Sequence, residues 1–196
     1  ASDAYKRQII DRVKTEGDRA VLEYEEKFDK VALTALAVTE AEQAEAEALV
    51  GEELKKAIRL AKRNIETFHA AQRFESKRVE TQPGVTCWQK AVAIEKVGLY
   101  IPGGTAPLFS TVLMLAVPAR IAGCKEIVLC TPPGKDGKVH PAVLFAAKVA
   151  GINRIFKAGG VQAIAAMAYG TESVPKVYKI FGPGNQYVTA AKQLVS

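Results

Sequence analysis

The sequence lacks the features that mark membrane and secreted proteins. No apolar run among its 196 residues approaches the roughly 20 residues that a membrane-spanning helix needs, and the N-terminus has no signal-peptide pattern. Its three cysteines, Cys87, Cys124 and Cys130, are an odd number without metal-ligand or redox spacing, so we interpret them as reduced thiols in apolar surroundings. A cytoplasmic protein that does not bind membranes is therefore expected.

Groups that could perform acid–base or metal chemistry are also scarce. The two histidines, His69 and His140, lie far apart in the chain, and His69 has no histidine partner at helical spacing. The C-terminal half contains only three acids, Glu126, Asp136 and Glu172. Since no acid–base pair or metal cluster can be read from these residues, the sequence predicts neither a catalytic residue nor a metal ligand in this chain.

Negative charge is concentrated in the N-terminal half. Residues 1–95 contain 16 Lys+Arg and 18 Asp+Glu, a net of −2, whereas residues 96–196 contain 11 and 3, a net of +8, which together give the overall +6. The basic residues are scattered and lack aromatic interleaving or a recognition-helix pattern, so nucleic-acid binding is a poor explanation. A phosphorylated small ligand fits better, although most of these lysines have their ordinary role on a solvated surface.

What the C-terminal half does contain is a repeated strand–turn–helix unit. Residues 97–114 combine an apolar strand pattern, a double-glycine turn and apolar residues at helical spacing. Three more apolar runs, at 126–130, 154–157 and 177–181, end in turns rich in glycine or proline and lead into helical segments. Four such units predict a parallel sheet with right-handed crossovers, whose turns all lie along the ligand-binding edge.

The N-terminal half is predicted to be mainly helical. The expected elements are two short helices within residues 1–29, a loosely periodic strand at 31–38, a helix started by Thr39 and Glu42 at capping-box spacing, a strongly amphipathic helix at 52–73 and a β-hairpin at 79–94. The fold class is therefore α/β: a Rossmann-like parallel sheet with flanking helices, preceded by a mainly helical N-terminal region.

Composition changes near residues 90–96, from a Glu-rich helical region to a Gly-rich one. We therefore expect two parts, a helical region with a β-hairpin at 1–95 and a Rossmann-like nucleotide-binding domain at 96–196. The sequence starts without methionine and stops within a predicted helix. We interpret it as part of a longer protein, with the second domain truncated at its C-terminal end and the first completed by missing sequence.

The glycine turns do not match the standard nucleotide-binding motifs. GGTAPL is not GxGxxG, and no GxxxxGK[ST] sequence is present. The second strand ends in Cys130, Thr131 and Pro132, where an ordinary dinucleotide site places an acid for the ribose. The sequence thus argues against a standard Rossmann or P-loop site.

Longer motifs indicate a family. GLYIPGGTAPLFSTVLM, AGGVQAIAAMAYGTESVPKV and KIFGPGN followed by YVTAAK resemble histidinol dehydrogenase, and ETQPGV and NIETFHAAQ extend the resemblance over nearly the whole chain. The resemblance implies a zinc- and NAD-dependent homodimer that oxidises L-histidinol to L-histidine through the aldehyde, the last step of histidine biosynthesis. It places NAD contacts on Tyr100, Gln162 and Asn185, each beside a glycine turn. Their alternative roles are a core tyrosine and two helix-start residues, because Asn is a good N-cap.

The same resemblance places the zinc ligands, the Glu–His pair for proton transfer and most histidinol contacts beyond the end of this chain. We therefore expect the 196-residue chain alone to be inactive. Two other functions stay open. One is another NAD(P) enzyme of the aldehyde-dehydrogenase-like group, which would need a nucleophilic cysteine such as Cys130. The other is a non-catalytic nucleotide-binding module.

Overall fold

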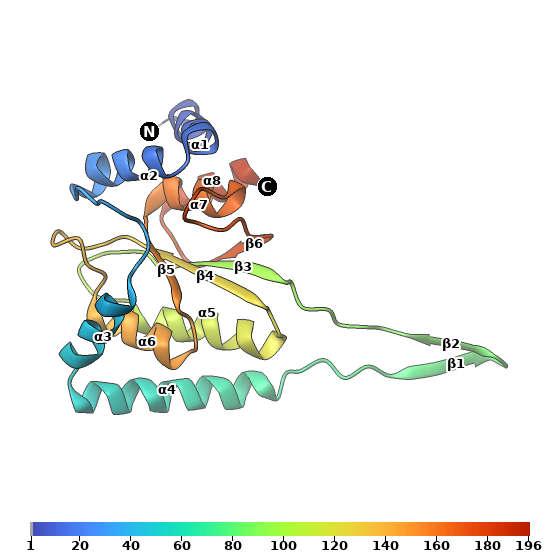
Figure 1. The fold of residues 1–196 in the computed structure, drawn as a ribbon. Helices are drawn as coiled ribbons and strands as arrows, with labels where there is room; N and C mark the ends of the chain where they lie inside the picture. The colour runs from blue at the N-terminus through green and yellow to red at the C-terminus, as the bar shows by residue number, and fades with distance from the viewer. Residues whose placement is uncertain (1) are drawn as a thin grey trace.

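A computed structural model describes residues 2–196. Its elements, in chain order, are α1 (Asp3–Glu16), α2 (Asp18–Tyr24), the π-helix η1 (Glu25–Asp29), α3 (Glu40–Leu49), α4 (Glu52–Ala70), β1 (Arg78–Gln82), β2 (Val85–Trp88), β3 (Lys96–Tyr100), α5 (Phe109–Ala122), β4 (Glu126–Thr131), α6 (Pro141–Val149), β5 (Arg154–Lys157), α7 (Gly160–Tyr169), β6 (Lys179–Phe181) and α8 (Gln186–Val195) (Figure 1). Among these helices, none combines the length and apolar character that a bilayer span requires.

The centre of the molecule is a four-stranded parallel sheet with the strand order β5-β4-β3-β6. In the register of the central strands, Leu99 of β3 lies opposite Leu129 of β4 and Phe181 of β6. Each strand is followed by a helix, which is the connection that parallel neighbours need. The predicted α/β fold, with four repeated units and a parallel sheet, is confirmed.

Helices cover both faces of the sheet (Figure 1). Because successive residues of a strand point to opposite faces, β4 directs Val128 and Cys130 into one core and Ile127 and Leu129 into the other. The first core lies beneath α7 and α8, with α1 and α2 outside them, and the second lies against α5 and α6, with α3 and α4 outside. The N-terminal helices thus form the outer layers on both faces. The expected domain boundary near residues 90–96 stays a prediction.

Strands β1 and β2 form a two-stranded arm that projects away from the helices and the sheet (Figure 1). All of its strand residues are exposed, including the apolar side chains of Val79, Val85 and Trp88. Gly84 has a φ of 83°, which suits the third residue of a type II turn. The predicted hairpin is therefore confirmed, but it pairs only as far as Trp88, and the segment leading to β3 has no strand partner.

The expected strand at residues 31–38 is wrong. The segment makes one isolated antiparallel bridge, between Ala37 and Phe156, and is otherwise irregular. Its backbone crosses the outer edge of β5, where Val38 N–H donates to the carbonyl of Ile155 and Lys157 N–H donates to the carbonyl of Leu36. The apolar residues of this segment shield an edge strand rather than follow the alternation of a regular one, which explains their loose periodicity.

Candidate functional site

The carboxyl ends of the parallel strands open into a pocket of about 510 Å³. The residues that line it come from the N-terminal helices, from three turns and from the start of α8: Tyr5, Lys6, Ile9, Phe28, Asp29, Tyr100, Pro102, Gly103, Gly104, Pro132, Pro133, Gly159, Gly160, Val161, Gln162, Asn185 and Tyr187. The structure thus brings Tyr100, Gln162 and Asn185 together, although they are widely separated in sequence. Their role in binding a cofactor stays a prediction.

Tyr100 is the last residue of β3 and is 4% exposed. Its hydroxyl oxygen accepts a hydrogen bond of 3.1 Å from the backbone N–H of Gly160, where α7 begins. Burial raises the pKa of Tyr100 to about 12, so the phenol is neutral at pH 7. The hydroxyl therefore stays protonated and can donate a hydrogen bond to a ligand.

Gln162 lies in the first turn of α7 and is 1% exposed. Its side-chain nitrogen donates to Oε1 of Glu25 at 2.9 Å, and the backbone N–H of Gly159 donates to the same oxygen at 2.7 Å. Glu25 accepts from one N–H of the Gln162 amide, which leaves the amide oxygen and the second N–H for other partners.

Glu25 supports the pocket and was not identified by the sequence analysis: it does not line the pocket but accepts hydrogen bonds from Gly159 and Gln162, which do. It is fully buried, and its second oxygen, Oε2, has no hydrogen-bond donor among the described residues. Burial, and then the neighbouring carboxylate of Asp29, raise the pKa of Glu25 to about 8, so it is largely protonated at pH 7. In the sequence, Glu25 and Asp29 belong to a run of charged residues that resembles an ordinary solvated helix face.

Asn185 is the N-cap of α8. Its side-chain oxygen accepts hydrogen bonds from the backbone N–H groups of Tyr187 and Val188, at 2.9 and 3.1 Å. The helix-start role that the sequence offered as an alternative is therefore present, and Asn185 lines the pocket as well. The turn before it needs glycine, because Gly182 has a φ of 146° and an added Cβ would lie 2.2 Å from the carbonyl oxygen of Tyr100.

The turn before α7 brings backbone close to the pocket. Gly159 and Gly160 both line it, and Gly160 has a φ of 59°. A Cβ on Gly159 would lie 2.8 Å from Cβ of Pro132, so this turn and the one after β4 touch. Gly159 has no side chain to cap the helix, but two of the backbone N–H groups at its start already have partners: that of Gly159 donates to Glu25 and that of Gly160 donates to the hydroxyl of Tyr100. Only the rest of the first turn is left for a ligand.

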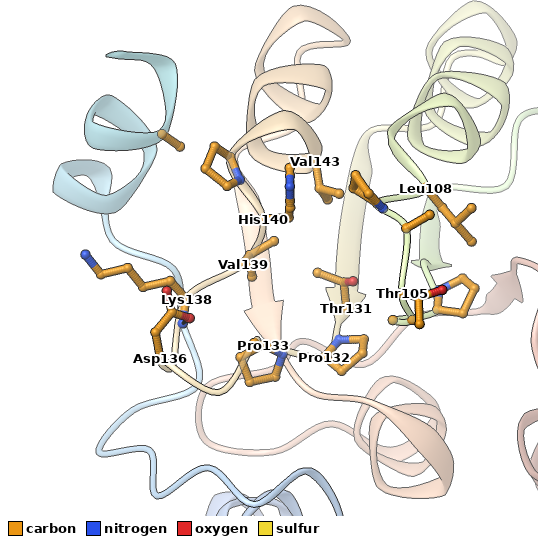
Figure 2. A pocket seen from close by; sticks show the side chains of 18 of the residues that line it. Thr105, Leu108, Thr131, Pro132, Pro133, Asp136, Lys138, Val139, His140 and Val143 are labelled. Carbon is orange, nitrogen blue, oxygen red and sulfur yellow. Dashed lines mark hydrogen bonds between the residues drawn. The ribbon is translucent and has the colours of Figure 1, made fainter. Parts of the chain in front are cut away.

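A second cavity, of about 430 Å³, lies between the turns after β3 and β4 and the helices α3 and α6 (Figure 2). It contains none of the three predicted residues. Two of its polar side chains already have partners: Lys138 Nζ lies 2.8 Å from an oxygen of Glu45, which also lines the cavity, and Nδ1 of His140 accepts a hydrogen bond from the backbone N–H of Ala142 at the start of α6. His140 thus acts as a helix cap.

The structure provides little support for a cysteine nucleophile. Cys130 is completely buried in the core beneath α7 and α8, and burial raises the pKa of its thiol well above the ordinary value. A buried, protonated thiol is inert, which argues against the aldehyde-dehydrogenase-like alternative. Among residues 2–196, no group of three or more His, Cys, Asp or Glu side chains is placed to hold a metal ion.

An open parallel sheet with crossover helices, glycine turns at its carboxyl edge and a pocket beside them defines an α/β protein of the Rossmann-like class. Comparison with known proteins is more specific: residues 3–196 match the family model for histidinol dehydrogenase. The chain therefore belongs to the histidinol dehydrogenase family, whose members are oxidoreductases.

Individual relatives agree with this. The chain is 80% identical over 190 residues to a histidinol dehydrogenase of Bacteroides fragilis, covering 97% of this chain and 44% of the relative. It is 57% identical over 199 residues to that of Salmonella typhimurium, covering 100% of this chain and 45% of the relative. The crystal structure of histidinol dehydrogenase from Elizabethkingia anophelis superimposes with a TM-score of 0.96 at 53% identity, over 98% of this chain and 44% of that one. The chain therefore spans less than half the length of these relatives.

Proposed function

We propose that this chain is the N-terminal part of an NAD-dependent histidinol dehydrogenase, which oxidises L-histidinol to L-histidine through the aldehyde in the last step of histidine biosynthesis. The observation that carries the proposal is the convergence of Tyr100, Gln162 and Asn185 on one pocket at the carboxyl edge of the sheet. These are the residues on which the family resemblance places NAD contacts, and membership of the family supports the assignment.

The residues of the pocket fit a dinucleotide. The volume of about 510 Å³ lies in the range usual for small-molecule sites. The turn at Gly159 and Gly160 has no side chains, so a ligand can approach the backbone closely. The neutral hydroxyl of Tyr100 and the amide groups of Gln162 and Asn185 suit the remaining polar atoms. When bound, NAD+ supplies the hydride acceptor for the reaction.

A zinc site does not fit the residues of this chain, since its described part contains no cluster of potential ligands. We propose that the zinc ligands, the proton-transfer residues and most histidinol contacts belong to the remaining length that the relatives have. On the family resemblance we also propose a cytoplasmic homodimer, with residues 1–95 and 96–196 as parts of two domains. The 196-residue chain then has a cofactor pocket but no catalytic groups.

Asn185→Ala in the full-length enzyme tests the cofactor site; full-length here means this chain extended by the remaining length of its relatives. The substitution removes a pocket contact, so we expect the Michaelis constant for NAD+ to rise about tenfold, as for the loss of about 1.4 kcal/mol of binding energy. Calorimetric titration with NAD+ should show the same loss of affinity, with unchanged zinc content.

Asn185→Ala also removes a helix cap, so a matched control is needed. Thr39→Ala provides one, because Thr39 caps α3 through a 3.1 Å bond to the backbone of Glu42 and lies outside the pocket. Both substitutions should cost about 1 kcal/mol of stability, but only the first should change NAD+ affinity. Equal effects of the two on NAD+ affinity, or none from Asn185→Ala, would remove Asn185 from the site.

A further inference from the structure

Among residues 2–196, Asp29 is the only acid that lines the pocket. It ends the π-helix η1 in the N-terminal region, and its Oδ2 lies 3.5 Å from the point where a Cβ on Gly159 would stand. The carboxylate therefore lies over the glycine turn at which α7 begins. This position is reached from a segment about 130 residues away along the chain, and no nucleotide-binding motif of the sequence includes it.

The sheet itself provides no acid at this place. In ordinary dinucleotide sites an Asp or Glu at the end of the second strand binds the hydroxyls of the adenosine ribose. Here the corresponding strand, β4, ends in Thr131, which is followed by Pro132 and Pro133. A dinucleotide in this pocket would thus lack its usual diol acceptor unless another element supplied one.

Asp29 lies beside a second carboxyl group, that of Glu25. The neighbouring Glu25 is fully buried, and its oxygen Oε2 receives no donor from the described residues. Burial, and then Asp29, raise the pKa of Glu25 to about 8. Asp29 itself lines the pocket, and the oxygens of its carboxylate offer several acceptor positions to hydroxyl groups there.

We propose that Asp29 binds the adenosine ribose hydroxyls of NAD+ and selects NAD+ against NADP+. A carboxylate accepts hydrogen bonds from a vicinal diol but repels the 2′-phosphate of NADP+. The inference rests on the proposed function, because it assigns Asp29 to the same cofactor pocket. It implies that the acid missing from the end of β4 is supplied by the N-terminal helical region.

Asp29→Asn in the full-length enzyme tests this role, with calorimetric titration and steady-state kinetics for both dinucleotides. The amide keeps the shape of the side chain and removes its charge. We expect affinity for NAD+ to fall roughly tenfold or more and the preference for NAD+ over NADP+ to narrow by at least that factor. Glu26→Gln is the matched control, since Glu26 is exposed on the same helix, does not line the pocket and should leave both affinities unchanged.

A cofactor analogue gives a second measurement, which uses the wild-type enzyme and so does not depend on whether the variant folds. The wild-type enzyme should bind 2′-deoxyadenosine NAD+ roughly tenfold more weakly than NAD+, because a hydroxyl that Asp29 accepts is gone. The Asn variant, where it folds, should discriminate less between the two. Equal wild-type affinity for NAD+ and the deoxy analogue, or an unchanged NAD+/NADP+ ratio in Asp29→Asn, overturns the inference alone. Wild-type enzyme that neither binds NAD+ nor forms NADH from histidinol overturns the proposed function and the inference with it.

Discussion

Glu25 makes the stability of the protein depend on pH in a direction unusual for a carboxyl group. Its pKa is raised from 4.5 to about 8 by burial and then by Asp29, so the folded protein binds a proton that the unfolded chain releases. The stability from this group is therefore complete below pH 4.5 and is lost as the pH rises through 8. Carboxylates that form salt bridges act in the opposite direction, because their pKa is lowered in the folded state.

The magnitude follows from the two pKa values. One pKa unit corresponds to about 1.4 kcal/mol, and linkage between 4.5 and 8 gives a fall in the free energy of unfolding of roughly 3 kcal/mol between pH 5 and pH 8. Glu25→Gln should remove this fall. The amide cannot ionise, and its oxygen still accepts from Gly159 and Gln162 while its nitrogen donates toward Asp29.

Urea denaturation followed by circular dichroism measures the effect. Wild-type and Glu25→Gln chains are unfolded at pH 5, 6, 7 and 8, and the difference between their unfolding free energies is plotted against pH. Taking the difference cancels the pH-dependent contributions that the two proteins share. We expect the unfolding free energy of the variant, relative to that of the wild type, to rise steadily above pH 5. A difference in unfolding free energy that does not change with pH would show that Glu25 is ionised in the folded state. That result would refute the reasoning.

Further outcomes follow from the site and the core. The 196-residue chain should form no NADH from histidinol and NAD+ with added zinc, since its described residues contain no metal cluster; zinc-dependent turnover would contradict this. Cys130 should resist alkylation by iodoacetamide in the native chain while exposed Cys87 reacts, as peptide mass analysis would reveal, and rapid labelling of Cys130 would contradict its burial. Gly182→Ala should lower stability by roughly 1–3 kcal/mol or more in thermal melts, because its Cβ meets the Tyr100 carbonyl, whereas Gly51→Ala, in open space, should have a much smaller effect.

The repeated units of the C-terminal half made the fold predictable from sequence. Each turn follows a strand of the same direction, so the parallel sheet places Tyr100, Gln162 and Asn185 at one edge, as the pattern indicates. The choice of these three residues came from the family resemblance, and the repeated pattern predicted only that the glycine turns beside them share one edge.

The N-terminal contribution to the pocket could not be predicted in this way. Glu25 reaches Gly159 and Gln162 across 134 and 137 residues, and no local pattern encodes such a contact. Residues 26–28, which follow Glu25 on η1, are exposed, so the segment resembles an ordinary solvated helix face. The prediction of a strand at 31–38 is wrong for a related reason. The apolar residues of this segment are placed by contact with the edge of β5 and do not alternate as in a regular strand.

The distance along the chain between Glu25 and Gly159 also determines when the two segments can meet during synthesis on the ribosome. The apolar faces of α1 and α2 pack against α7, which leaves the ribosome more than a hundred residues later. At about 5–20 residues per second, the 134 residues between Glu25 and Gly159 take roughly 7–27 s to appear. During this interval Ile9, Val13 and Val21 have no native partner on α7. The pocket at the carboxyl edge of the sheet is thus assembled late, and the nascent N-terminal helices expose their apolar faces until α7 emerges.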